Sequence, residues 1–175
     1  MKKSRNPIVK RVVDRFETIQ QVAQMFVTSN SSQRGLLISG DAGMGKSHYV
    51  KQAFIETGTT GRVDYCKSRS FTAAAMYAKL WENSKPGDVV VFDDCSLSSM
   101  MNENFRKLTD FFKGALELTS GPRMLGYEAA TTNPLFRDLG VPREFDFQGS
   151  IIWITNTSFD KLAKKFGDHW EAIER

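Results

Sequence analysis

The sequence predicts an α/β fold with a mainly parallel β-sheet, and three observations support this prediction. Short apolar runs bounded by turn residues alternate with longer segments in which apolar residues recur every three or four positions. One of these runs, Val89–Phe92, is apolar throughout, which is typical of a parallel strand buried on both faces. A glycine-rich loop joins another apolar run to the helical segment after it. Alternating strands and helices build βαβ units, which give parallel sheets.

Each expected element follows from a local pattern. Helices are assigned where apolar residues recur with a period of about 3.6, and strands where a short run is apolar or alternates. Turn residues separate these segments, and Ser70 is expected to cap the helix that follows it. In chain order, we expect a helix at 8–26, a strand at 35–39, a helix at 46–56, a strand at 63–66, a helix at 71–81, a strand at 89–92, a helix at 102–118, a strand at 150–155 and a helix from 159 to the end.

Residues 123–149 are the least regular part of the chain. They contain Pro134 and Pro142 and show no sustained period, although Glu144–Phe147 alternates as an edge strand does. We therefore expect a hairpin or an ordered loop in this segment.

Length and composition indicate one soluble domain over residues 1–175. A chain of 175 residues can bury one substantial core, and its 41% hydrophobic and 25% charged residues are ordinary for a globular protein. No apolar stretch is long enough to span a bilayer, and the basic start lacks the apolar segment of a signal peptide. We therefore expect a cytoplasmic protein with no membrane partner.

Cysteine, histidine and charge give weaker indications. The two cysteines, Cys66 and Cys95, are too few for a disulfide framework and are expected to be buried, reduced thiols. His48 and His169 have no partners at metal-ligand spacing. The formal net charge is +4 at pH 7, and several basic residues lie near the N-terminus. This basic N-terminus is either an arm that binds DNA or RNA or a solubilising tail; its residues are Lys2, Lys3, Arg5, Lys10, Arg11 and Arg15.

The strongest chemical signal is a phosphate-binding loop between the strand at 35–39 and the helix at 46–56. Residues 40–47 read GDAGMGKS and fit the pattern G-x-x-x-x-G-K-[ST]. In this pattern backbone N–H groups surround the β-phosphate, the lysine reaches the β and γ oxygens, and the hydroxyl ligates Mg²⁺. The dipole of the following helix also favours the anion. The sequence thus predicts a site for a nucleoside triphosphate formed by Asp41, Ala42, Gly43, Met44, Gly45, Lys46, Ser47 and His48.

Two carboxylates follow the apolar strand at 89–92. Magnesium on a triphosphate needs a hard oxygen ligand on a rigid element opposite the phosphate loop, and Asp93 fits that description. Asp94, one residue further on, could orient or deprotonate an attacking water. Ser47 and Asp93 are therefore the expected metal-binding residues.

A polar side chain also follows the strand at 150–155. Asn156 at this strand end could hold the attacking water in line without carrying a charge. Its significance comes from the order of the three signals along the chain: the phosphate loop, an apolar strand with two aspartates, and an apolar strand with Thr155 and Asn156.

On these motifs the sequence resembles the AAA+ ATPases over about residues 7–175. Residues 40–47 are similar to the Walker A motif of this family, 89–94 to Walker B, and 151–156 to the strand that ends in sensor 1. Segments 92–94, 111–116 and 145–152 look in particular like small AAA+ proteins encoded by bacteriophages.

The resemblance implies a three-layer P-loop NTPase sandwich that binds ATP with Mg²⁺, hydrolyses it and assembles into a ring or filament. It also implies an arginine finger from a neighbouring subunit. Arg175 lies about where such a residue falls after sensor 1, and the alternative is an ordinary arginine at a helix end. Lys46, Asp94, Asn156 and Arg175 are thus the expected catalytic residues.

The sequence departs from the family in two ways. Asp94 stands where the family usually has glutamate, so either the water is held closer or hydrolysis is slow. The chain also ends where the fifth strand and the helical lid of the family would begin, and we expect a fragment of the AAA+ core that lacks the lid.

The segment 67–71 occupies the place of the family's pore loop. Lys67, Arg69 and Phe71 could contact the phosphates and bases of a single strand, or Phe71 could simply pack against the next helix. Three functions remain open: an AAA+ motor acting on DNA, RNA or protein, a P-loop kinase for nucleosides or nucleotides, and a nucleotide-dependent interaction module without turnover. The order of the motifs favours the motor.

Overall fold

The computed structural model describes residues 21, 35–59, 61–67, 72–94, 123–127, 134–167 and 170. Its elements, in chain order, are β1 (Gly35–Ser39), α3 (Lys46–Thr57), β2 (Val63–Cys66), α4 (Ala73–Glu82), β3 (Val89–Asp93), β4 (Met124–Gly126), α6 (Pro134–Arg137), β5 (Glu144–Asp146), β6 (Ser150–Thr155) and α7 (Phe159–Phe166). Gln21 is helical, but the rest of the helix predicted at 8–26 lies outside the described residues, as do the helix predicted at 102–118 and the predictions for Cys95, His169 and Arg175.

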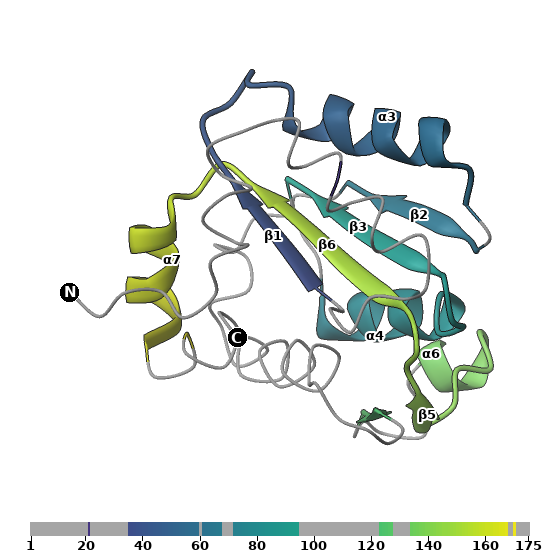
Figure 1. Cartoon of the computed structure of the whole chain (residues 1–175). Coiled ribbons are helices and arrows are strands. Elements are labelled where there is room, and N and C mark those ends of the chain that lie inside the picture. The colour runs from purple at the N-terminus through teal and green to yellow at the C-terminus, as the bar shows by residue number, and fades with distance from the viewer. Residues whose placement is uncertain are drawn as a thin grey trace.

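The central sheet is parallel, as the sequence predicts. Its four strands have the order β1-β6-β3-β2, and each pair of neighbours runs in the same direction. Strand β6, the last of the four along the chain, lies between β1 and β3 (Figure 1). Parallel strands place their carboxyl ends at one edge of the sheet, so the residues after β1, β3 and β6 come close together in space.

The sheet is buried on both faces because its side chains alternate between two apolar clusters. Helix α3 covers one face, and α4, α7 and the segment around β5 cover the other (Figure 1). All five residues of β3 are buried, which confirms that this continuous apolar run is a central strand. Cys66 is a buried, reduced thiol in the cluster beneath α4 and α7. The α3 cluster consists of Leu36, Ile38, Val50, Ala53, Phe54, Val89, Val91, Ile152 and Ile154.

A second, small sheet precedes β6. Strands β4 and β5 pair antiparallel, and the four-residue helix α6 lies between them in the chain. The strand predicted at 144–147 is therefore confirmed to within one residue, but it belongs to a sheet of its own. The Tyr77 hydroxyl of α4 donates to the carbonyls of Leu125 and Pro142, at 3.2 and 3.1 Å, and attaches this unit to the main body. Figure 1 shows β5 and α6 at the end of the main sheet opposite the loop between β1 and α3.

Two predicted helix boundaries are wrong. Helix α4 begins at Ala73, not at Phe71, and its cap is Thr72 instead of Ser70, because the Thr72 hydroxyl accepts a 3.1 Å hydrogen bond from the Ala75 N–H. The last segment, expected to be one helix from 159 to the end, is interrupted: α7 ends at Phe166, Trp170 is helical again, and residues 168, 169 and 171–175 lie outside the described part of the chain. Gly167 follows α7 with a positive φ of 53°, a backbone conformation that glycine adopts far more readily than other residues, and its N–H still donates to the Ala163 carbonyl.

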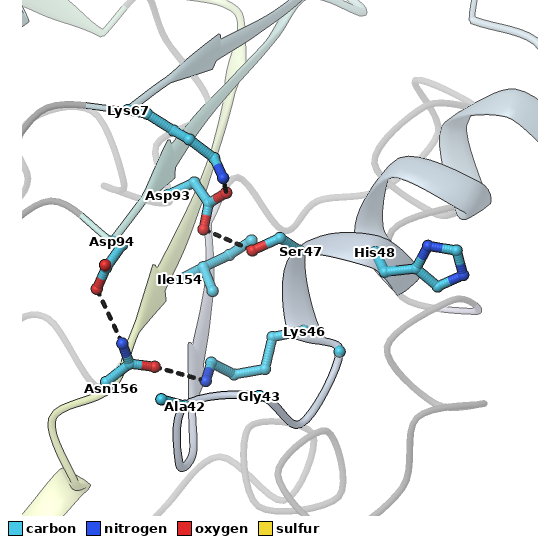
Figure 2. Close-up of a pocket in the computed structure, with 11 residues that line it drawn as sticks. Ala42, Gly43, Lys46, Ser47, His48, Lys67, Asp93, Asp94, Ile154 and Asn156 are labelled. Carbon is cyan, nitrogen blue, oxygen red and sulfur yellow. Dashed lines mark hydrogen bonds and ion pairs between the residues drawn. The ribbon is translucent and has the colours of Figure 1, made fainter.

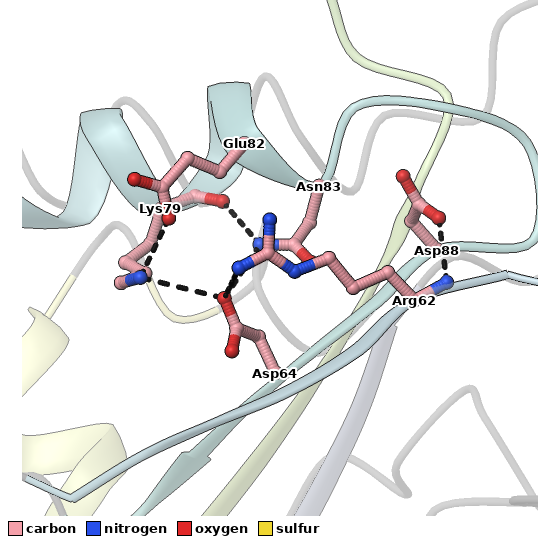
Figure 3. Close-up of polar contacts among 6 residues, drawn as sticks. All are labelled: Arg62, Asp64, Lys79, Glu82, Asn83 and Asp88. Carbon is pink, nitrogen blue, oxygen red and sulfur yellow. Dashed lines mark hydrogen bonds and ion pairs between the residues drawn. The ribbon is translucent and has the colours of Figure 1, made fainter. Parts of the chain in front are cut away.

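A polar cluster fixes the connection between β2, α4 and β3. Figure 3 shows Arg62, Lys79 and Asn83 converging on Asp64, with the Arg62 pair at 3.1 Å and the Asn83 hydrogen bond at 3.2 Å. Burial pushes the pKa of Asp64 upward, but the hydrogen bond from Asn83 and the charges of Lys79 and Arg62 hold it below its usual value. Asp88 accepts from the Arg62 N–H at 2.8 Å and so anchors the neighbouring strand. These contacts join β2, α4 and the segment before β3 at the edge of the sheet opposite the phosphate loop.

Candidate functional site

The loop between β1 and α3 depends on glycine at two positions. Gly43 and Gly45 have φ angles of 83° and 78°, in the left-handed region that residues with a Cβ rarely adopt. A Cβ on Gly45 would also lie 3.2 Å from the Tyr49 ring. Gly45 is the N-cap residue of α3 and has no side chain to accept a hydrogen bond. A serine or aspartate cap would accept one from the first N–H groups of the helix. The loop thus presents backbone donors at the start of α3.

A polar pocket of about 410 Å³ lies at the carboxyl edge of the sheet, beside this loop (Figure 2). It unites the phosphate-loop pattern with the ends of β3 and β6, which the sequence separates by many residues. Its lining residues are Ala42, Gly43, Gly45, Lys46, Ser47, His48, Lys67, Asp93, Asp94, Ile154 and Asn156.

Two of the predicted loop residues do not line the pocket. Met44 is 47% exposed at the tip of the loop, and Asp41 is exposed as well. Asp41 contributes its carbonyl oxygen, which accepts a 2.7 Å hydrogen bond from the Lys46 ammonium. The backbone of Asp41 thus holds Lys46, while contact between Asp41 and a nucleotide stays a prediction.

Ser47 and Asp93 meet at the centre of the pocket. The Ser47 hydroxyl donates a 2.6 Å hydrogen bond to Oδ1 of Asp93, whose residue is only 2% exposed. The second oxygen of Asp93 lies 3.2 Å from the ammonium of Lys67, a side chain that is 64% exposed. Figure 2 shows Lys67 reaching over from the end of β2 to the carboxylate. The buried carboxylate of Asp93 thus contacts both a hydroxyl and an exposed ammonium.

Lys46 makes a second set of contacts across the pocket. Its ammonium donates to the carbonyl of Gly40 at 2.8 Å, to that of Asp41 at 2.7 Å and to Oδ1 of Asn156 at 2.8 Å. The amide nitrogen of Asn156 donates in turn to Oδ1 of Asp94 at 2.9 Å. Lys46, Asn156 and Asp94 therefore form one hydrogen-bonded row (Figure 2).

The backbone of Asp94 is in an unusual conformation. Its φ of 55° lies in the left-handed region, which is uncommon for residues other than glycine, asparagine and aspartate. Its N–H donates to the Ile154 carbonyl at 3.0 Å, so β3 stays bonded to β6 up to this point. The left-handed turn directs the carboxylate toward Asn156, which lies at the end of the neighbouring strand. Such strained residues are concentrated at functional sites.

Burial shifts two pKa values at this edge. Burial lowers the pKa of Lys46, while the carboxylates of Asp94, Asp41 and Asp93 act in the opposite direction. Burial raises the pKa of Tyr65 to about 12, and the charge of Asp93 adds to this effect. Tyr65 lies on β2 and faces α3, where the Lys51 ammonium lies 5.2 Å from the centre of its ring.

The described residues contain no group of three or more histidine, cysteine, aspartate or glutamate side chains that could hold a metal ion. The pocket offers instead the oxygens of Ser47 and Asp93, which are hard donors. This donor set fits Mg²⁺ that arrives with a phosphate group, because magnesium commonly takes one or two protein oxygens and fills its other positions with phosphate oxygens and waters.

The pocket brings together most of the predicted site and adds two residues. Lys46, Ser47, Asp93, Asp94 and Asn156 lie together, and exposed His48 lies at the margin. Ile154, which the sequence analysis did not select, lines the wall, and Lys67 was predicted to contact a nucleic acid instead of Asp93. The signal for Lys67 was its position one residue after β2, since the pairing Cys66↔Phe92 places it beside Asp93. Arg69 and Arg175 lie outside the described residues.

The fold and the pocket define an α/β protein that has a parallel four-stranded sheet and a charged pocket at its carboxyl edge. In sequence the chain is similar to the "Uncharacterized 36.7 kDa protein in nrdC-mobD intergenic region" of Enterobacteria phage T4, with 26% identity over 177 residues. The match covers 99% of this chain and 51% of the relative, so the chain spans about half the length of the curated relative that it matches. No protein-family model and no solved structure matched the chain.

The phage source of this relative agrees with the resemblance to phage-encoded proteins. Within the part of the chain that the structure describes, no helix has the length and apolar character needed to cross a bilayer.

Proposed function

We propose that the chain is an ATP-binding and ATP-hydrolysing P-loop protein of the AAA+ type. The observation that carries this proposal is the 2.6 Å hydrogen bond between Ser47 and Asp93, because it unites the last residue of the phosphate-loop pattern with the buried acid of a distant strand. Lys46 lines the same pocket. A lysine, a hydroxyl and a carboxylate in this arrangement are the parts that bind a magnesium-chelated triphosphate.

Size and polarity support this ligand. A pocket of about 410 Å³ is within the usual range for a small-molecule site, and polar groups from three segments converge on it. The left-handed glycines of the loop and the start of α3 direct backbone donors toward the same space, where an anion is favoured. A triphosphate tail satisfies both the donors and the positive charge of Lys46.

Each side chain has a distinct task in the proposed reaction. Lys46 and the loop amides neutralise the phosphate oxygens, and Ser47 with Asp93 holds the cation. Asp94 accepts the proton of the attacking water, and Asn156 orients that water. When bound, magnesium ATP supplies the phosphoryl group and the divalent charge that offsets charge developing on it.

The order of the strands supports the assignment to the AAA+ type. Because β6 lies between β1 and β3, Asn156 is placed between the phosphate loop and the acidic pair. A residue in that position can contact both the terminal phosphate and the water that attacks it. This is the place that the resemblance assigns to sensor 1.

The proposed biological role is that of a motor that assembles as a ring or filament and remodels or translocates nucleic acid or protein. Asp94 and Asn156 are exposed at the mouth of the pocket, so a residue of a neighbouring subunit can approach the terminal phosphate. Arg175 is our candidate for that residue, and Lys67, Arg69 and the basic N-terminus are candidates for contact with DNA or RNA.

A nucleotide-dependent interaction module is the second candidate. Asp94 favours it, because an aspartate reaches one methylene less far than the glutamate usual at this position, and slow turnover would follow. Phosphate release over many turnovers decides between the two candidates, since a module binds ATP without producing phosphate at a useful rate.

The proposal is tested by calorimetric titration of the full chain with ATP, first with Mg²⁺ and then with EDTA. We expect magnesium to strengthen binding, and Asp93→Asn to remove most of that magnesium-dependent gain, roughly tenfold or more, because a neutral amide is a much weaker cation ligand. Asp88→Asn is the matched control, since Asp88 is equally buried but lies at the opposite edge of the sheet. Binding that is unaffected by magnesium would refute the proposal. Phosphate release with single-stranded DNA, RNA or an unfolded protein added in turn then identifies the polymer.

Lys67 gives a further prediction. Its ammonium lies 3.2 Å from the carboxylate that is proposed to hold the cation, so it must move away when the divalent ion binds. We expect Lys67→Ala to raise the affinity for Mn²⁺ in the presence of ADP by about two- to fivefold, the range of a partly exposed ion pair. Electron paramagnetic resonance of free Mn²⁺ measures this affinity. Lys85→Ala, an exposed lysine at the other edge of the sheet, serves as the control, and a fall in Mn²⁺ affinity in Lys67→Ala would contradict the prediction.

A further inference from the structure

The ammonium of Lys46 is fully occupied by groups of the protein itself. A lysine ammonium has three N–H donors, and those of Lys46 reach three acceptors, the carbonyls of Gly40 and Asp41 and the side chain of Asn156, within 2.8 Å. Lys46 is also only 8% exposed. A phosphate can therefore receive hydrogen bonds from Lys46 only after at least one of these internal contacts is broken.

Of the three acceptors, Asn156 is the one that joins Lys46 to another functional group. Gly40 and Asp41 belong to the loop that carries Lys46, whereas Asn156 follows β6 and also donates to Asp94 at 2.9 Å. The amide has one orientation that satisfies both neighbours, because an ammonium only donates and a carboxylate only accepts. Its oxygen must face Lys46 and its nitrogen must face Asp94, as Figure 2 shows.

We propose that Asn156 restrains Lys46, so that nucleotide binding must break the Lys46–Asn156 hydrogen bond and thereby frees the amide oxygen for the attacking water. This inference rests on the proposed function and concerns the regulation of the same site. Lys46 has two alternative partners, the amide oxygen or a phosphate. When a phosphate takes the lysine, Asn156 keeps its bond to Asp94 and presents an acceptor next to the proposed base. The positions that hold the water are thus completed only when nucleotide is present.

The proposal makes nucleotide affinity and turnover change in opposite directions. In Asn156→Ala, Lys46 has one internal acceptor fewer to give up, so we expect magnesium ADP to bind more tightly, by roughly two- to tenfold, the usual range for one net hydrogen bond. ADP is the suitable probe because it lacks the γ-phosphate that Asn156 would contact. Turnover should fall at least about tenfold in the same variant, because the amide no longer orients the water.

A second variant and a control sharpen the test. Asn156→Asp keeps an oxygen opposite Lys46 but adds a negative charge beside Asp94 and the phosphates, so we expect ADP affinity to fall roughly tenfold or more. Thr157→Ala is the matched control, because the described hydrogen bonds of Thr157 are made by its backbone atoms. Asn156 is exposed, and melting temperatures of the variants should match that of the wild type.

Calorimetric titration of each full-length variant with magnesium ADP gives the decisive numbers. Tighter binding to Asn156→Ala supports the restraint, whereas unchanged or weaker binding overturns it and leaves the proposed function intact. If the wild-type chain itself binds neither ADP nor ATP, the proposed function fails and the restraint fails with it.

Discussion

Replacement of Lys46 with alanine is expected to lower the affinity of the chain for ATP by roughly 100-fold. Lys46 is the one lysine among the described residues that is both buried and inside the pocket, and three carboxylates, Asp94, Asp41 and Asp93, lie close enough to influence its pKa. Without the ammonium, a triphosphate would lie beside the carboxylates of Asp93 and Asp94 with less positive charge to offset them. Calorimetric titration with magnesium ATP measures the loss.

The control for this variant is Lys51→Ala. Lys51 lies on α3, four residues after Ser47. It is not among the residues that line the pocket, and its ammonium lies over the Tyr65 ring. Both variants remove one positive charge from the same helix, so a general electrostatic effect would weaken binding equally. A loss confined to Lys46→Ala shows a direct contact. Equal losses, or retained affinity in Lys46→Ala, would mean that the pocket does not bind the phosphates.

The sequence predicted the central sheet and the meeting of Ser47 with Asp93 because both depend on regular geometry. Continuous apolar runs specify buried parallel strands, and parallel strands in one sheet end at the same edge. Ser47 and Asp93 are 46 residues apart. They meet because Asp93 is the last residue of β3, and the position of β3 in the parallel sheet brings its carboxyl end beside the phosphate loop. Pattern and topology together were sufficient for this part of the site.

The remaining features depend on side-chain reach or on local competition between similar residues. Ser70 and Thr72 are both good helix caps, and the sequence does not show which hydroxyl meets a first-turn N–H. Lys67 could be placed next to Asp93 only once the neighbour and register of β2 were known. The pairing of β4 with β5 joins segments whose strands are three residues each, too short for a clear alternating pattern.

Contacts within the pocket pair most of its charged groups with one another, in two rows. Lys67 neutralises Asp93 in one row, and Lys46 is linked to Asp94 through Asn156 in the other. Each row joins one strand end to another segment, and the proposed function requires a phosphate and a cation to replace these contacts. Under the proposed function, the free energy spent on breaking these contacts lowers the affinity for the ligand, and Asp94 and Asn156 take up their catalytic roles only when the ligand binds.

Replacement of Asp94 with asparagine is expected to reduce the rate of ATP hydrolysis by about 10² to 10⁴-fold while leaving the stability of the fold unchanged. Asparagine tolerates the left-handed conformation that Asp94 adopts at φ of 55°, and its amide oxygen can still accept the hydrogen bond from Asn156. It cannot take a proton from water. Phosphate release under saturating magnesium ATP measures the rate, and thermal unfolding measures the stability.

Asp94→Ala separates the chemical role of this residue from its strained backbone. Alanine also lacks a base, so the loss of turnover should match that of Asp94→Asn. Alanine, however, has no polar side chain that can form the local hydrogen bonds that stabilise the left-handed conformation. Asp94→Ala should therefore have a free energy of unfolding about 1 kcal/mol lower than that of Asp94→Asn. If both variants hydrolyse ATP at the wild-type rate, Asp94 is not the base. Equal stability of Asp94→Ala and Asp94→Asn would show that the left-handed backbone does not favour aspartate or asparagine over alanine at this position. The presence of aspartate there would then be explained by its catalytic role alone.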